Sequence, residues 1–596
     1  EDPAALRSHF GSSLLASVVW VVVAILKSVP GIEQIQKDIA KVKAEFNYTE
    51  DKDLKGPDEK DRDTPDSRVP RSAWMNRLTG IRPFNSEAPV SLLKAKGFLT
   101  PPTLHYVRNH GLCPQLSWHT HRIDISGLVD RPMAFSMDEL VRLPTVSVPV
   151  TLQRAGNRRK ERNLIQKGIG FNWGCAAAST SIWTGVPLRA LMKHVGIKSQ
   201  EEGANWINFE GPTGEVPQGD TTYGASHARG AMMNPARPVM LAFMMNGELL
   251  HPDHGYPVRL LIPGYIGGRM IKWLTKISVT EEEGESHYHI FDNRVFPKHV
   301  TSKDEATKHK IWKDAACTIN DRNMNSAIWA PAHCEKVSLS QSAYEVGGYA
   351  YNGAGRPIHR LEVTLNDGHT WRPAEIQRFE RPNEFGMVYC WVHWTVDVPV
   401  RDLRNCFEFA VRCWDDSQNC QPERPTWNLM GMMNNPWFRV KVHDVPGANA
   451  IWFEHPTRVE PNLKHAWDKD RLHLTADGQL PSPGWQERLQ RAYSAAFAPL
   501  PLEQQPLDGE AYNDKARFLR TETAQSGAAA AKKPPAPAAG IEISREAMSG
   551  DGSMGNVGLK VDGGVQCPHC RQRFGSERAL QQHFKFTHDP NRHQED

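Results

Sequence analysis

The chain has 596 residues and a formal charge of only +3 at pH 7, so its overall charge does not indicate a nucleic-acid-binding protein. This length exceeds what a single hydrophobic core covers, and roughly two to four domains are expected. The ten cysteines lack the regular spacing of a secreted disulfide framework, which favours a reducing or mixed compartment.

The first segment with a clear signature is apolar. Residues 10–26 carry no charge and end before Lys27, at the lower edge of the length that spans a bilayer. We therefore expect a transmembrane anchor at residues 10–29, with a buried core helix or a surface-lying segment as the alternative. The sequence opens at Glu1 without a methionine, which suits a removed presequence or a truncated chain.

Residues 30–73 are expected to form a short helix and a charged linker. Ile35, Ile39, Val42 and Phe46 recur at helical spacing. Residues 49–71 mix charges with prolines and hold too little apolar surface to order themselves. They are predicted to be a solvated tether or a segment that lies on a partner.

Residues 151–174, TLQRAGNRRKERNLIQKGIGFNWG, combine glycines, clustered arginines and the asparagines Asn157 and Asn172. Glycine allows close backbone approach to a ligand, and arginine binds phosphate or carboxylate with a planar fork of donors. The stretch therefore predicts a loop around a large anionic ligand. The triplet Arg108, Asn109 and His110 in LHYVRNHG is weak evidence alone, because such residues often satisfy loop backbone groups.

Both stretches resemble the molybdopterin oxidoreductases of the sulfite oxidase and eukaryotic nitrate reductase family. The similarity continues through NGELLHPDHGYPVRLLIPGYIGGRMIKWL at residues 246–274 and WNLMGMMNNPWFRVKV at 427–442. It implies an α+β fold, with a sulfite-oxidase-type molybdopterin-binding domain at residues 74–312. An immunoglobulin-like β-sandwich of the dimerisation type would follow at residues 313–447, where short alternating strands are predicted.

The resemblance also implies roles for individual residues. The substrate pocket would contain Arg108, Arg159, Trp173, Asn293 and Met430, of which the last two favour the nitrate reductase branch. The pterin and its phosphate would be bound by Arg108, Asn109, His110, His254, Arg259, Arg269 and Lys272.

One position departs from the family. There the loop reads CAGNRR and its cysteine thiolate binds molybdenum, whereas this chain has Arg154 at the matching place. A guanidinium stays protonated and has no electron pair to give to a metal. We expect a pocket in which molybdopterin could bind but molybdenum could not. Cys175 could supply the thiolate only if the loop were rebuilt, and Arg154 would pair with a carboxylate or with an anion in the pocket.

Local signals predict further details. Ser136 and Glu139 form a capping-box pattern for a short helix, and Asn366-Asp367-Gly368 is a hairpin turn signal. The sandwich aromatics are expected to be core residues rather than ligand contacts; they are Trp371, Trp391, Trp394 and Trp414.

The C-terminal part is predicted to be an extended, low-complexity linker at residues 448–560 and a zinc finger at 561–596. Cys567, Cys570, His583 and His588 have the C-x2-C-x12-H-x4-H spacing of a ββα finger, a closed tetrahedral zinc site. One finger reads only about 3 base pairs, so protein contact is favoured over nucleic-acid binding.

These features favour a membrane-anchored, catalytically inactive relative of the family that serves as an accessory subunit of a larger complex, with the mitochondrial inner membrane as the expected location. The sequence shows no haem motif and no Gly-rich dinucleotide fingerprint, so electrons would come from another protein. Two alternatives stay open: an active molybdenum-dependent oxidoreductase with an external electron carrier, and a module that binds a pterin, another anion or RNA.

Overall fold

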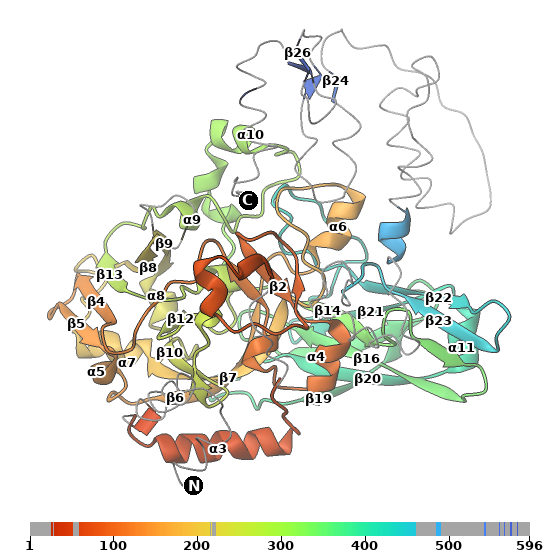
Figure 1. Cartoon of the computed structure of the whole chain (residues 1–596), viewed down its shortest axis with the longest axis horizontal. Coiled ribbons are helices and arrows are strands. Elements are labelled where there is room, and N and C mark those ends of the chain that lie inside the picture. The colour runs from red at the N-terminus through yellow and green to blue at the C-terminus, as the bar shows by residue number, and fades with distance from the viewer. Residues whose placement is uncertain are drawn as a thin grey trace. The chain divides into compact units, whose positions relative to one another are not determined.

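The computed structural model describes residues 26–27, 29–51, 59–214, 216, 222–459, 484–489, 542–543, 559–560, 565–566, 573–574 and 581 (Figure 1). The chain divides into two compact units, and the larger one contains residues 1–162 and 168–482. The smaller unit includes the strand pairs β24 (Glu542–Ile543) with β25 (Leu559–Lys560) and β26 (Val565–Gln566) with β27 (Arg573–Phe574).

Two predictions fall largely or wholly outside the described residues. The anchor predicted at 10–29 is described only at residues 26–27 and 29, and the four zinc ligands Cys567, Cys570, His583 and His588 are not described. Among the residues that are described, no helix combines the length and the hydrophobicity needed to cross a bilayer.

The helix predicted after the first apolar segment is confirmed as α3 (Ile32–Glu45). It buries Ile39 close to Gly247, where a Cβ atom would lie 3.4 Å from the Ile39 side chain. Beyond its end, the Phe46 ring packs edge-on against Phe98 and Phe379, with centroids 4.9 and 5.3 Å away. The helix is therefore docked on the rest of the larger unit by apolar contacts.

The prediction of a solvated charged linker is wrong for residues 59–71. This segment contains the 3-10 turns η1 (Glu59–Asp61) and η2 (Pro65–Arg68), and Asp61, Asp66 and Arg71 are buried. The Arg71 guanidinium donates to the carboxylates of Asp61, Asp66 and Asp253. Arg71 and Arg77, which also binds Asp61, offset most of the charge of the three carboxylates inside the fold, which composition alone does not reveal.

Three sheets build the first part of the larger unit. A small sheet joins β1 (Asn76–Arg77), β2 (Phe84–Glu87) and β3 (Val107–Asn109). The second has the order β11-β10-β7-β6 with β12 beside β10; its strands are β6 (Val146–Gln153), β7 (Ala178–Pro187), β10 (Met240–Met245), β11 (Glu248–Leu249) and β12 (Arg259–Leu261). The third has the order β5-β4-β13-β8-β9; its strands are β4 (Arg122–Gly127), β5 (Met133–Ser136), β8 (Trp206–Thr213), β9 (Thr222–Ala228) and β13 (Lys276–Thr280).

Short helices connect these strands: α4 (Val90–Lys96), α5 (Met137–Leu140), α6 (Arg159–Ile165), α7 (Leu188–His194), α8 (Arg229–Met232), α9 (His287–Ile290) and α10 (Lys303–Lys308). The predicted capping box is confirmed at α5, where Ser136 accepts from the backbone of Glu139 and Glu139 accepts in return. Every residue of β10 is buried, because side chains cover both faces of the second sheet. The hydrophobic cluster that contains β10 also includes Tyr106, Leu152, Tyr223 and Met270, which line the pocket described below.

Two antiparallel sheets follow, the arrangement that the alternating sequence predicts (Figure 1, right). One contains β14 (Asn325–Ala330), β16 (Ala343–Tyr351), β20 (Val392–Pro399) and β19 (Glu375–Arg378). The other contains β15 (Lys336–Ser338), β23 (Ala450–Glu454), β22 (Phe438–Asp444), β21 (Glu408–Asp415), β17 (Ile358–Thr364) and β18 (Arg372–Pro373), and α11 (Val400–Asn405) follows β20. Side chains of both sheets meet in one hydrophobic core.

The predicted hairpin turn joins β17 to β18, and both Asp367 and Gly368 have positive φ angles, 53° and 87°. Of the sandwich tryptophans, Trp391 and Trp394 are core residues as predicted. Trp371 and Trp414 are half-buried instead and stack with the Arg412 guanidinium, which lies 3.7 and 5.0 Å from their ring centres.

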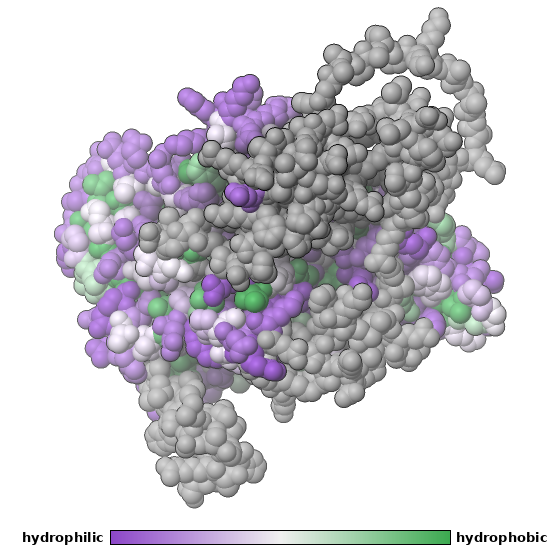
Figure 2. Space-filling view, turned by 45° about the horizontal axis from the view of Figure 1, so that its top comes forward, coloured by the Kyte–Doolittle hydropathy of each residue, from purple (hydrophilic) through white to green (hydrophobic). Residues whose placement is uncertain are grey.

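Hydrophilic residues dominate the described surface in Figure 2, with hydrophobic residues in small separate spots. Large exposed hydrophobic side chains include Ile81, Met133 and Phe407, which are far apart in the sequence. Spots of this size are normal for a folded surface.

A buried histidine of the sandwich predicts how stability depends on pH. Burial, and then the charge of His333, lowers the pKa of His455 to about 3. As pH falls, the imidazole of His455 is therefore protonated in the unfolded chain before it is protonated in the folded protein. The stability that the neutral ring contributes is fully present above pH 6.5 and is lost as pH falls toward 3. In His455→Gln an amide can still bond to the carbonyl of Pro331, which the ring contacts at 2.8 Å.

Between pH 7 and pH 5, the wild type should lose about 2 kcal/mol of unfolding free energy relative to His455→Gln, measured by urea denaturation at each pH. His359→Gln, at an exposed position, is the matched control and should follow the wild type. A constant difference between wild type and His455→Gln across this range would contradict the assignment.

Candidate functional site

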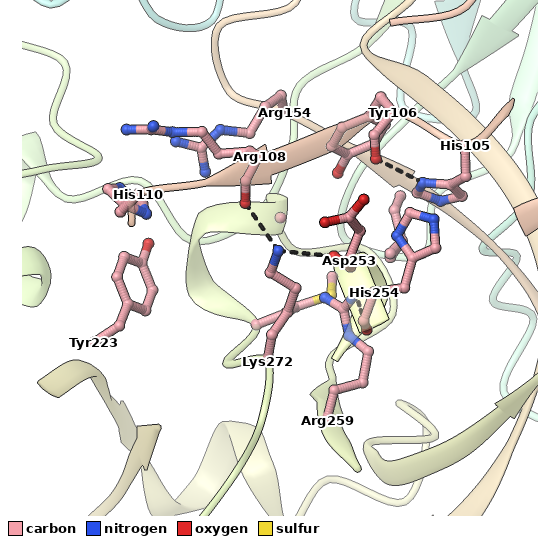
Figure 3. A pocket seen from close by; sticks show the side chains of 13 residues that line it. His105, Tyr106, Arg108, His110, Arg154, Tyr223, Asp253, His254, Arg259 and Lys272 are labelled. Carbon is pink, nitrogen blue, oxygen red and sulfur yellow. Dashed lines mark hydrogen bonds between the residues drawn. The ribbon is translucent and has the colours of Figure 1, made fainter. Parts of the chain in front are cut away.

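A pocket opens where β3, the end of β6, β12 and the turns η4 (Pro252–His254) and η5 (Gly267–Arg269) meet (Figure 3). Its cavity volume is about 50 Å³, and the pocket is partly open to solvent. Its lining residues are His105, Tyr106, Arg108, His110, Leu152, Arg154, Tyr223, Asp253, His254, Arg259, Gly267, Met270 and Lys272.

The lining is strongly cationic. Arg108, Arg154, Arg259 and Lys272 contribute four positive side chains, against one carboxylate, Asp253. Burial works against the charge of Asp253, but Arg71 and its hydrogen bonds outweigh that effect, so the pKa of Asp253 is lowered. Asp253 is therefore ionised and already paired, and the pocket keeps a net positive charge that suits an anion.

Two histidines of the lining present a nitrogen without a partner. Burial, followed by the charges of Arg259 and Lys272, lowers the pKa of His105 to about 3. Burial and the charges of Arg108, Arg154 and Lys272 lower the pKa of His110 well below its usual value. Both rings are thus neutral, and the Nε2 atoms of His105 and His110 have no hydrogen-bond partner among the residues that the structure describes. A buried polar atom normally has one, so a ligand with polar groups fits this pocket.

The ammonium group of Lys272 is held in place by three hydrogen bonds to neighbouring residues. Its Nζ atom donates to the carbonyl oxygens of Arg108 at 3.0 Å and Asp253 at 2.9 Å, and to Oδ1 of Asn109. Asn109 in turn donates to Oδ1 of Asp253 at 2.8 Å. Asn109 is therefore not part of the lining and fixes Lys272 and Asp253 from behind.

Arg154 lies directly after β6 and is nearly buried, with 6% of its surface exposed. Arg154 lines the pocket (Figure 3). Burial raises the pKa of Tyr106 and Tyr223 and the charge of Arg154 opposes this, whereas burial and that same charge both lower the pKa of His110. Cys175 is buried away from the lining, and its carbonyl oxygen accepts from the Tyr349 hydroxyl. The lining residues that the structure describes include no cysteine.

Five of the residues predicted to bind cofactor line the pocket: Arg108, His110, His254, Arg259 and Lys272. Arg269 does not, because its fully buried guanidinium donates to the carbonyl of Ile319 at 2.7 Å and contacts His289 at 2.9 Å.

Most residues predicted for the substrate pocket also lie behind the lining. The Trp173 indole is fully buried beside Phe171 and is not among the lining residues of this pocket. Asn293 is fully buried, and Met430 lies in a hydrophobic cluster. Arg159 donates to the carbonyl of Gly431 at 3.1 Å.

Arg159 nevertheless stays connected to the pocket wall. Its guanidinium lies 5.7 Å from the centre of the Phe171 ring, and that of Arg108 lies 5.2 Å from the same ring. One aromatic ring thus separates Arg159 from a residue of the lining.

Sequence reasoning missed several lining residues. His105 and Tyr106 stand within the stretch LHYVRNHG, and Asp253 stands beside His254, so their neighbours pointed to them. Tyr223 comes from β9, far from the recognised stretches, and carried no local signal.

Comparisons with known proteins identify two domains of this chain. Residues 110–288 match the family described as "Oxidoreductase molybdopterin binding domain", and residues 316–445 match the "Mo-co oxidoreductase dimerisation domain". The chain is 51% identical over 410 residues to "Nitrate reductase [NADH]" of Volvox carteri, covering 68% of this chain and 47% of that protein. It is 48% identical over 425 residues to "Nitrate reductase [NADH] 2" of Phaseolus vulgaris, covering 70% and 48%.

A solved structure, the sulfane dehydrogenase SoxCD from Paracoccus pantotrophus, aligns with a TM-score of 0.49 at 22% identity, over 62% of this chain and 87% of that one. The chain spans about half the length of the nitrate reductases it matches. Within that part it is a homologue of nitrate reductases and carries a molybdopterin-binding domain followed by a Mo-co dimerisation domain.

Proposed function

We propose that this chain, a nitrate reductase homologue with the molybdopterin-binding and dimerisation domains of that class, binds a phosphorylated pterin in its cationic pocket without using it to reduce nitrate. The observation that carries the proposal is the lining itself, in which Arg154 stands among three other cations.

The organic part of the cofactor fits these residues. A phosphate group suits the forked donors of Arg108 and Arg259 and the point charge of Lys272. A pterin ring carries donors and acceptors that could satisfy the Nε2 atoms of His105 and His110. By resemblance Asn109, His254 and Arg269 belong to the same set, of which His254 lines the pocket and the other two support it.

The metal does not fit. When bound, molybdenum would supply two-electron redox chemistry, and its family anchors it through a soft thiolate. The matching position holds the Arg154 guanidinium, which offers no lone pair. We therefore assign no reduction step to this pocket.

An accessory role follows for the rest of the chain. The dimerisation domain at residues 316–445 supports pairing of two chains through the sandwich. The apolar residues 10–26 and the Cys567 to His588 pattern support a subunit held at a membrane within a larger assembly. The identity to nitrate reductases favours a second candidate, a working oxidoreductase that takes electrons from another protein.

Metal and pterin analysis of the purified chain tests both candidates. We expect fluorescent pterin to be released on denaturation and oxidation, with molybdenum at background level by mass spectrometry. Molybdenum close to one atom per chain would support the oxidoreductase instead. The absence of both pterin and molybdenum from protein isolated from its natural source would reject the cofactor and leave a simpler anion as the ligand.

A further inference from the structure

A buried ion network joins residues 61–77 to the pocket. Arg71 binds Asp253 through two parallel hydrogen bonds, from Nε to Oδ2 at 2.9 Å and from Nη2 to Oδ1 at 2.8 Å. The same guanidinium donates to Asp61 at 2.7 Å and to Asp66 at 3.0 Å. Arg77 holds Asp61 from the other side with two bonds of 2.8 Å. Arg71 and Arg77 are thus joined through Asp61, and Arg71 connects this pair to Asp253.

Asp253 is the point where this network enters the pocket. It is the carboxylate among the described lining residues, and an unbalanced negative charge there would repel an anionic ligand. The side chain is 1% exposed, so solvent does not screen its charge. A buried cation is needed to offset that charge. Arg71, which Asp61 and Asp66 share, supplies it from a segment separated by 182 positions in the sequence.

The carboxylate also orients the cationic side of the pocket. Its Oδ1 atom accepts from Asn109 at 2.8 Å, and Oδ1 of Asn109 accepts from Lys272. The position of Lys272 therefore depends, through Asn109, on how Arg71 holds Asp253.

We propose that Arg71 is a positioning residue for the anion pocket: it offsets the charge of Asp253 and orients the Asn109 and Lys272 pair, so that the Arg71 guanidinium tunes the affinity of the pocket. The inference rests on the proposed function in requiring an anionic ligand. By linkage, a bound anion should in turn stabilise the packing of residues 59–71.

Sulfate is the probe, because it stays a dianion over the pH range of the test. Isothermal titration at pH 7.5 should show binding to the wild type and binding weaker by roughly tenfold or more in Arg71→Gln. Arg68→Gln is the matched control: Arg68 lies in the same segment but donates to the carbonyl of Cys113 at 2.7 Å, and its variant should bind as the wild type does.

Two rescues separate a charge effect from a merely structural one. Without Arg71, Asp253 is a buried, less compensated carboxylate that takes up a proton on mild acidification, so binding by Arg71→Gln should recover from pH 7.5 to pH 5.5 more than that of the wild type. The double variant Arg71→Gln with Asp253→Asn should bind sulfate nearly as the wild type does at both pH values.

The wild type measured in parallel accounts for the other groups around Asp253. Its own segment contributes His251 and His254, and the neighbouring segments contribute Asp61, Asp66, Arg71, Cys113 and Lys272.

Each outcome of these titrations supports or overturns the inference. Equal sulfate binding by the wild type and Arg71→Gln would overturn the inference about Arg71 but not the proposed anion pocket. A loss of binding that neither rescue restores would have the same meaning. No sulfate binding by the wild type would overturn the proposed anion pocket and the inference with it. If Arg71→Gln does not fold, Asp253→Asn alone should bind sulfate several-fold more tightly than the wild type, and unchanged or weaker binding would count against the inference.

Discussion

The Arg154→Cys protein should carry molybdenum when it is produced together with the complete cofactor, whereas the wild type should not. The substitution places a thiolate donor at the end of β6, in a pocket whose cationic lining is otherwise kept. Molybdenum bound to a pterin dithiolene prefers such a soft ligand. The expected change is from background to near-stoichiometric metal, measured by mass spectrometry on the purified protein.

Arg154→Ser is the matched control for this experiment. It removes the same positive charge and frees similar space but supplies no thiolate, so its metal content should stay at background. Equal metal in the wild type, the serine variant and the cysteine variant would show that position 154 does not decide metal binding, and the proposed function would lose its main support.

Replacing Arg158 with methionine should lower the unfolding free energy by about 3–5 kcal/mol, because it leaves a carboxylate uncompensated in the interior. The Arg158 side chain is fully buried and binds both oxygens of Glu161, at 2.9 and 2.8 Å. It also donates to Oδ1 of Asn325 at 2.8 Å and to the carbonyl of Pro436 at 2.7 Å. One side chain thus ties the loop after β6 to the sandwich.

A double variant shows how much of that loss comes from the stranded charge. Arg158→Met with Glu161→Met removes both members of the pair and should be less destabilised than Arg158→Met alone, as measured by urea denaturation. Arg401→Met is the control, because the Arg401 side chain is 84% exposed, and its change should stay within about 0.5 kcal/mol. A loss below about 1 kcal/mol in Arg158→Met would contradict the role assigned to this residue.

The pocket was largely predictable because its residues stand in stretches with recognisable chemistry. Arg108, His110, Arg154, Arg259 and Lys272 all came from such stretches, and the structure gathers them in one lining. The alternating strands of residues 315–445 likewise predicted two antiparallel sheets. Local patterns are sufficient where a residue's role depends on its near neighbours.

The failures have a different physical origin. Residues 59–71 were predicted to be a solvated linker because their charges are unfavourable to bury singly. Their burial depends on tertiary contacts, such as the bond from Arg71 to Asp253, which is remote in sequence. Trp173 and Arg269 lie within recognised stretches but face inward, since a stretch that builds a pocket also contains the residues that support it from behind. Side-chain direction of this kind is decided by tertiary packing.

The spread of the pocket's walls along the chain has a consequence for how the protein is made. The lining comes from residues 105–110, 152–154, 223, 253–259 and 267–272, and Arg71 reaches it from farther upstream. Contacts between such distant residues close large loops, and the entropic cost of closure makes them late events in folding. During synthesis on the ribosome, the arginines of residues 154–162 emerge well before Asp253 and Lys272, so a ligand can be captured only by a nearly finished domain.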